Sequence, residues 1–233
     1  MRHRLRTSER PGRPAFDPQR DVRAQLLNAA THLFAEHGVA ATTIAHIAKS
    51  AGFTPAMVHY YFKDRDQLTD AVIEERLVPF ISYVWDPVRP GDGPATMLGG
   101  VVQRLISGIE GAPWIPSTWM REILNEGGLL RTKALRRIPL DKVRMVGEAI
   151  RAGQATHSAN SDVDPLLTVF SALGLVMLHM ATAPVFAEIF HRPPLATEAL
   201  RRHITGLLLD GLCHHPRPSS SQFPNRQRLR RKP

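Results

Sequence analysis

The sequence is poor in cysteine and in aromatic residues. Cys213 is the single cysteine among 233 residues, so the chain can form no internal disulfide, which is the usage expected in a reducing cytoplasm. No segment alternates polar and apolar residues with a period of two, so no sheet is predicted. The chain also lacks a glycine-rich phosphate loop, a His-Glu-x-x-His motif and a Gly-x-Ser-x-Gly motif. We therefore expect an all-α protein that is not an enzyme and needs no cofactor.

Charge is distributed unevenly along the chain. Residues 1–65 hold ten Lys and Arg against five Asp and Glu, and residues 214–233 hold six against none. Residues 66–213 hold fourteen against sixteen and are close to neutral. A near-neutral body with basic ends favours a polyanionic partner that binds at one end. Solubility alone would explain the C-terminal run, but not a basic N-terminal segment that has the pattern of a folded domain.

The longest apolar stretch, "PLLTVFSALGLVMLHMA" from Pro165, is interrupted by His179 and followed by Pro184. It is short for a membrane span, and its Ser, Thr and His would be costly in lipid. The sequence predicts a buried helix here and no membrane partner. The basic N-terminus has no apolar segment behind it, so it does not have the pattern of a signal peptide.

Hydrophobic periodicity and turn residues divide the chain into four parts and predict about nine helices, all within the two central parts. Residues 1–20 and 214–233 are rich in Pro and Arg and are expected to be disordered arms. Residues 21–66 are expected to form one small helical domain, and residues 67–213 a larger one. A helix that starts after Asp64, at about Asp66, and runs to Pro79 or just beyond is expected to lead into the larger domain. In that domain we expect further helices over 94–110, 114–126, 132–153, 164–182 and 195–213.

The segment "TPAMVHYYFKDRDQL", residues 54–68, places three aromatics side by side in a chain that is 6% aromatic. Adjacent helical residues point about 100° apart, so one buried stripe cannot hold all of them. Thr54 is a good N-cap, and Pro55 suits the first helical position. A preceding short helix from Thr42 or Thr43 to Ala51 makes this a helix-turn-helix, whose second helix enters the DNA major groove.

This interpretation assigns a role to each side chain of the second helix. Val58 and Phe62 are expected to face inward against Ile47 and Leu33. Small residues at its start let the backbone approach base edges, and tyrosine hydroxyls and cations at its end suit phosphates. Half-buried packing of one of the two tyrosines explains that tyrosine equally well. The expected DNA-binding residues are Thr43, Thr54, Pro55, Ala56, His59, Tyr60, Tyr61, Lys63 and Arg65.

Residues 26–68 resemble the DNA-binding domain of the TetR family of transcriptional regulators, in its AcrR-like form. The features that carry the resemblance are Leu33-Phe34, Gly38, Thr42-Thr43, Ala51-Gly52 and Tyr60-Tyr61-Phe62 followed by a basic residue and Leu68. His59 and Tyr61 stand where the family often has tyrosine and histidine. The resemblance implies a homodimer that binds pseudo-palindromic operator DNA. It also implies a C-terminal domain that dimerises and binds a small-molecule effector, usually to relieve repression.

The larger domain is less informative. A ligand pocket could be lined by Trp114, Trp119, Met120, Phe170 and Met177, although plain core packing explains each of them equally well. Arg121 and Glu122 fit either a solvated face or the polar end of that pocket. Cys213-His214-His215 offers too few convergent ligands for a metal site, so none is expected. The alternatives are a DNA-binding dimer whose C-terminal domain binds a protein or nothing, and an enzyme with an accessory DNA-binding domain, for which no catalytic constellation is present.

Overall fold

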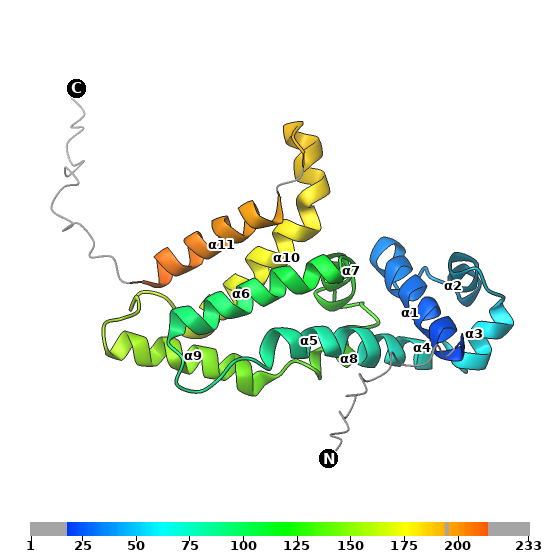
Figure 1. Cartoon of the computed structure of the whole chain (residues 1–233), viewed down its shortest axis with the longest axis horizontal. Coiled ribbons are helices and arrows are strands. Elements are labelled where there is room, and N and C mark those ends of the chain that lie inside the picture. The colour runs from blue at the N-terminus through cyan, green and yellow to red at the C-terminus, as the bar shows by residue number, and fades with distance from the viewer. Residues whose placement is uncertain (1–17, 194–195, 214–233) are drawn as a thin grey trace, which may run out of the picture.

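The computed structural model describes residues 18–193 and 196–213, and every regular element within these ranges is helical. Figure 1 shows a small N-terminal bundle at one end of an elongated helical body. We call the bundle the head and the rest the body. The head consists of α1 (Pro18–His37), α2 (Ile44–Ala51), α3 (Pro55–Tyr61) and the start of α4 (Arg65–Val72). The expected arms at 1–20 and 214–233 lie almost wholly outside the described residues, except that α1 already begins at Pro18.

The body continues directly from α4, without a linker. Its first elements are the π-helical segment η1 (Ile73–Leu77), α5 (Val78–Trp85), α6 (Pro94–Gly111), α7 (Trp114–Thr118) and the π-helical segment η2 (Trp119–Ile123). They are followed by α8 (Arg131–Leu135), α9 (Leu140–Ala155), α10 (Pro165–Phe190) and α11 (Thr197–Leu212). In the body, α6 packs against α5, α9, α10 and α11, so the core of the body lies around α6.

Prolines account for most differences from the predicted helix ranges. The helix predicted to end near Pro79 continues to Trp85, and the π turn Ile73–Leu77 ends two residues before that proline. Proline lacks an N–H and its ring displaces the carbonyl four residues earlier, which a wider π turn can accommodate. The helix predicted over 132–153 is broken, because Pro139 separates α8 from α9. The helix predicted over 114–126 becomes α7 and η2, and it ends at Ile123.

Helix α10 is longer and less buried than predicted. It passes through Pro184 to Phe190, where His191 takes the left-handed conformation. Its buried residues are Val169, Ala172, Val176 and Met177. Of its most apolar 18-residue window, only 22% is buried. By length and composition alone α10 could cross a membrane, which is weak evidence for a single helix. Figure 1 shows its C-terminal end projecting beyond the other helices. The prediction of a buried helix was therefore wrong for most of its surface.

Candidate DNA-binding interface

Local capping positions the two short helices of the head. The Thr43 hydroxyl accepts a hydrogen bond of 3.1 Å from the His46 N–H, and the Thr54 hydroxyl accepts one of 3.4 Å from the Met57 N–H. Both threonines lie where the sequence predicted helix starts. Gly52 closes α2 at φ 76°, in the left-handed region that glycine adopts without strain. These caps fix the turn between α2 and α3.

The core of the head holds α3 by one face. Val58 and Phe62 are buried, together with Ile47 of α2, while Leu33 is partly buried against the same cluster. The guanidinium of Arg23 lies 4.5 Å from the centre of the Phe62 ring and covers it from α1. The inward orientation predicted for Val58 and Phe62 is confirmed.

The three consecutive aromatics lie in three different environments. Phe62 is buried, Tyr61 is partly buried against the core, and Tyr60 is 74% exposed. The Tyr60 and Tyr61 rings meet edge to face, with their centres 5.1 Å apart. Packing therefore accounts for the positions of Phe62 and Tyr61, whereas most of the Tyr60 side chain lies outside the core of the head.

The other predicted contact residues surround this exposed tyrosine. Pro55, Ala56 and His59 are exposed on α3, and Lys63 is exposed just beyond its end. Lys63 and Gln67 help to start α4, because the Lys63 N–H donates to the Gln67 side chain and the Gln67 N–H to Asp64. Arg65 differs from the rest. It is only partly exposed, and its Nε and Nη2 are enclosed without a hydrogen-bond partner in the described part of the chain.

Ion pairs hold α4 and η1, the helical segments that connect the head to the body, against α8 and α1. The ammonium of Lys133, on α8, lies 2.6 Å from Asp66 and 2.7 Å from Asp70 of α4. Burial by itself lowers the pKa of Lys133, but hydrogen bonds and charge from the two aspartates outweigh it, and the pKa is raised. Lys133 therefore stays charged at neutral pH, and it loses its charge, and with it these ion pairs, as the pH rises through that raised pKa. Arg137 pairs with Glu74 of η1 in the same way, and Arg23 of α1 pairs with Glu75.

The residues predicted to line a ligand pocket are not all brought together. An apolar cavity of about 50 Å³ lies among α5, α6, α7, η2 and α10, and Trp119 and Met177 line it. Trp114 instead lines an open groove between α1 and α7. Met120 is partly buried, and Phe170 is 62% exposed on α10, so the prediction of a pocket position for Phe170 was wrong. In the described ranges no group of three or more His, Cys, Asp or Glu side chains is arranged to hold a metal.

Sequence reasoning missed the role of Glu122, a residue of the body that contacts the head. Glu122 is buried in η2, and its carboxylate accepts a hydrogen bond from the Val39 N–H at the turn after α1. It is neither on a solvated face nor at a pocket, the two positions that its sequence neighbourhood suggested. The contact joins residues 83 positions apart, so no local pattern could have indicated it.

Comparison with known proteins identifies the class of the head. Residues 26–72 match the family described as "Bacterial regulatory proteins, tetR family". The HTH-type transcriptional repressor KstR2 of Mycolicibacterium smegmatis is 35% identical over 88 residues, which are 38% of this chain and 43% of that protein. The aligned part spans less than half the length of the first curated relatives it matches. These relatives are named as transcriptional regulators, in agreement with the prediction of a non-enzymatic protein.

Solved structures extend the similarity to the whole fold. The ketosteroid transcriptional regulator KstR2 of Mycobacterium tuberculosis has a TM-score of 0.66 at 19% identity, over 83% of this chain and 95% of that one. FadR from Bacillus subtilis, solved with stearoyl-CoA, has a TM-score of 0.60 at 19% identity, over 81% and 98% of the two chains. Residues 26–72 therefore match the TetR family, and the fold of the described chain is similar to the folds of these two regulators.

Proposed function

We propose that this protein is a homodimeric transcriptional repressor of the cytoplasm, which binds a pseudo-palindromic operator and leaves it when an apolar small molecule binds. The observation that supports DNA binding most directly is the exposed face of α3. There Pro55, Ala56, His59 and Tyr60 are held outward by a buried Val58 and Phe62. We divide the chain accordingly, with a reading head over 21–66 and an effector and dimerisation domain over 67–213.

The position of each residue on α3 suggests its role. Pro55, Ala56 and His59 lie on the exposed face at and after the helix start, where a recognition helix meets base edges. Tyr60, Tyr61, Lys63 and Arg65 lie at the other end, where hydroxyls and cations suit phosphate oxygens. Thr43 and Thr54 cap the two helix starts, whose free N–H groups suit the backbone phosphates.

The exposed apolar face of α10 supports dimerisation. Side chains at helical spacing form one stripe that is at least half exposed, which we call the α10 stripe: Leu167, Phe170, Leu178, Val185 and Ile189. On α11, Leu207 is also more than half exposed. Pairing of α10 and α11 across a two-fold axis would bury this surface and place two α3 helices about 34–36 Å apart, or a multiple of one DNA turn.

The apolar cavity is the proposed starting point of the effector site. Leu77, Trp85, Trp119 and Met177 are among the residues around its 50 Å³. This volume holds no drug-sized molecule, since such sites measure about 300–1,000 Å³. An effector would therefore have to bind an expanded conformation of the body, and it would weaken operator binding by its preference for that conformation. Two structural neighbours, named for ketosteroid regulation and for a stearoyl-CoA complex, suggest a bulky apolar effector.

The small size of the cavity favours one alternative. A DNA-binding dimer whose body takes no small molecule, and serves dimerisation or a protein partner, needs no larger cavity. The two functions differ in whether any apolar compound changes operator affinity.

A selection from random double-stranded oligonucleotides tests both levels of the proposal. We expect enrichment of an inverted repeat, bound by two copies of the chain, and loss of that preference in a Pro55, Ala56 and His59 triple variant. Operator binding is then measured with stearoyl-CoA and with a steroid ketone as probes. Failure to enrich any sequence would refute the DNA-binding function. Enrichment without a response to either probe would favour the alternative.

A further inference from the structure

Glu122 makes a buried contact between body and head. Its side chain is 5% exposed, and its two carboxylate oxygens accept from two backbone donors. Oε1 accepts from the Val39 N–H of the head at 2.8 Å, and Oε2 from the Leu129 N–H of the body at 3.0 Å. We call this arrangement the Glu122 latch. A buried carboxylate is costly unless it is hydrogen-bonded, and a buried N–H needs an acceptor, so each partner satisfies the other.

Two glycines allow the backbone to approach Glu122 from both sides. Gly38, in the head, has φ 82°, and a Cβ there would lie 3.0 Å from Glu122 Oε1. Gly128, in the body, would place a Cβ 1.9 Å from the Glu122 carbonyl oxygen, a distance that no side chain tolerates. The absence of a side chain at Gly38 therefore leaves room for the Glu122 carboxylate, and its absence at Gly128 leaves room for the Glu122 backbone.

The segment that carries Glu122 is itself held firmly. The guanidinium of Arg131 donates to the carbonyls of Ile123 and Leu124 at 3.0 and 2.9 Å, and so caps the end of η2. The Leu124 N–H donates to the Trp119 carbonyl at 3.0 Å, which closes the π turn. Trp119 lines the apolar cavity, so cavity and latch share one short turn.

We propose that Glu122 is a positioning residue that fixes the angle of the head on the body. This inference rests on the proposed function, because in a dimer the angle of each head sets the distance between the two α3 helices. The head is attached covalently through α4, which alone would leave it free to pivot. Glu75 and Arg76 of η1 also hold α1, but these contacts and the Lys133 ion pairs with α4 are partly exposed. The latch adds a buried contact at the turn after α1. Opening the latch lets the heads leave the spacing that matches successive major grooves.

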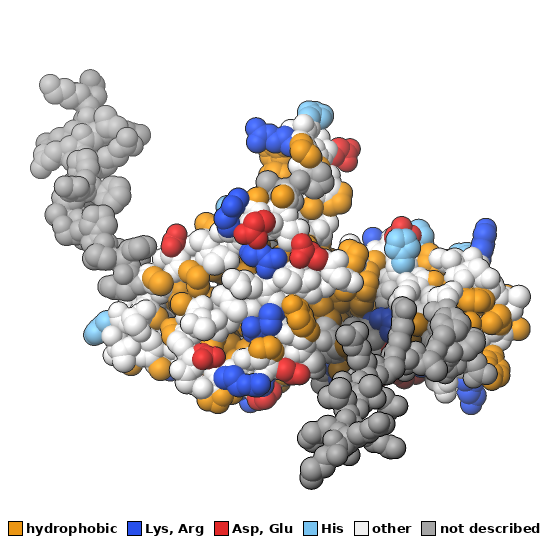
Figure 2. All heavy atoms as spheres, in the orientation of Figure 1, with side chains coloured by type: hydrophobic (Ala, Val, Ile, Leu, Met, Phe, Trp, Pro, Cys, Tyr) orange, Lys and Arg blue, Asp and Glu red, His pale blue; other side chains and the backbone are white. Residues whose placement is uncertain are grey.

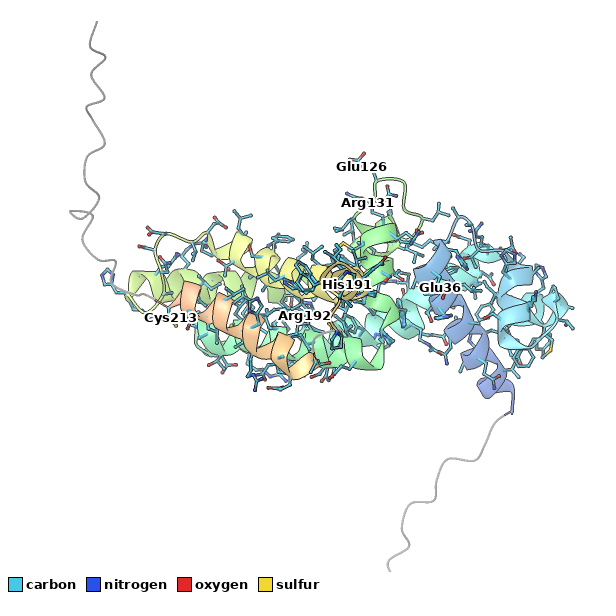
Figure 3. All side chains as sticks on the ribbon, turned by 90° about the horizontal axis from the view of Figure 1, so that it is seen from above. Glu36, Glu126, Arg131, His191, Arg192 and Cys213 are labelled. Carbon is cyan, nitrogen blue, oxygen red and sulfur yellow. The ribbon has the colours of Figure 1, made fainter. Side chains whose placement is uncertain are left out.

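The test replaces Glu122 by Gln, which keeps the size but has one acceptor oxygen for two N–H donors. Glu126→Gln is the matched control, since Glu126 lies exposed on the loop after η2 and points away from the head (Figure 3). Binding is measured to the selected inverted repeat and to an isolated half-site. We expect E122Q to weaken binding to the repeat by about tenfold, the equivalent of one hydrogen bond to a charged group, and to leave half-site binding unchanged.

A second measurement needs no DNA. Spin labels on Lys49→Cys, an exposed position of α2, in a Cys213→Ser background report the distance between the two heads. The distance distribution should broaden in E122Q and stay narrow in E126Q, and the Val39 amide should lose protection from hydrogen exchange. Equal loss of half-site and repeat binding, or an unchanged distribution in E122Q, would overturn the inference. If the wild-type chain selects no DNA, the proposed function fails, and the distance measurement still decides the role of Glu122.

Discussion

The proposed dimer makes a quantitative prediction about Phe170→Asp. Complete burial of a Phe side chain contributes about 1.5–3 kcal/mol. Phe170 is 62% exposed in the single chain, so its burial against a partner is worth about 1–2 kcal/mol in each copy. A two-fold dimer carries the substitution in both copies, so the total loss of dimerisation free energy is about 2–4 kcal/mol. This loss weakens the dimer by about 30- to 1,000-fold. The desolvation of the new carboxylate adds to this loss.

Sedimentation velocity across micromolar concentrations measures the effect directly. The control is Leu140→Asp, because Leu140 is 56% exposed at the start of α9, outside the α10 stripe. Phe170→Asp should sediment as a folded monomer and lose binding to the inverted repeat, whereas L140D should remain a dimer. Figure 2 shows apolar side chains on the projecting end of α10, interrupted by only a few charges. A Phe170→Asp chain that remains as dimeric as L140D would refute the assignment of this face.

Three further predictions concern the head, the link and the cavity. Tyr60→Phe should weaken binding to all DNA sequences by about 0.5–1.5 kcal/mol, whereas His59→Ala should change the preferred sequence, as competition binding with selected and random DNA will measure. Lys133→Ala should lower the free energy of unfolding by about 1 kcal/mol, with a smaller loss at high salt, and exposed Arg136→Ala should have no effect in the same urea titrations. Trp119→Ala should lower the free energy of unfolding by about 3 kcal/mol, because it enlarges the cavity. Added indole should then raise the melting temperature of this variant but not that of the wild type. A variant of Trp119 that indole leaves unchanged would show that the cavity does not accept an apolar guest.

The head was predictable because its structure is specified locally. The caps Thr43, Thr54 and Asp64 and the glycine Gly52 each act within a few residues of their place in the sequence. The burial of Val58 and Phe62 follows from their four-residue spacing. The environment of the tyrosines was predicted less fully, since helical spacing alone does not decide between Tyr60 and Tyr61 as the packed one.

The body was harder to predict because its helices depend on tertiary contacts. Pro139 was a visible signal and does end a helix, but Pro79 and Pro184 lie inside helices that continue past them. The exposure of Phe170 depends on which helices cover α10, and an apolar side chain alone does not indicate whether it faces a core or a partner. Glu122 was missed for a related reason, because its partner in the head is distant in sequence.

The two π turns connect these observations. In η1, Leu77 lines the cavity, while the Arg76 guanidinium donates to the Ala24 carbonyl of α1 at 3.2 Å. In η2, Trp119 lines the same cavity, while Glu122 accepts from Val39. Each π turn thus has one residue at the cavity and one in contact with the head, and π turns are frequent at functional sites. A molecule that expands the cavity would press on both π turns at once, and these hold α1 and the turn that follows it. We therefore expect the head to respond as one body that rotates, since the α4–η1–α5 helix runs unbroken through Pro79.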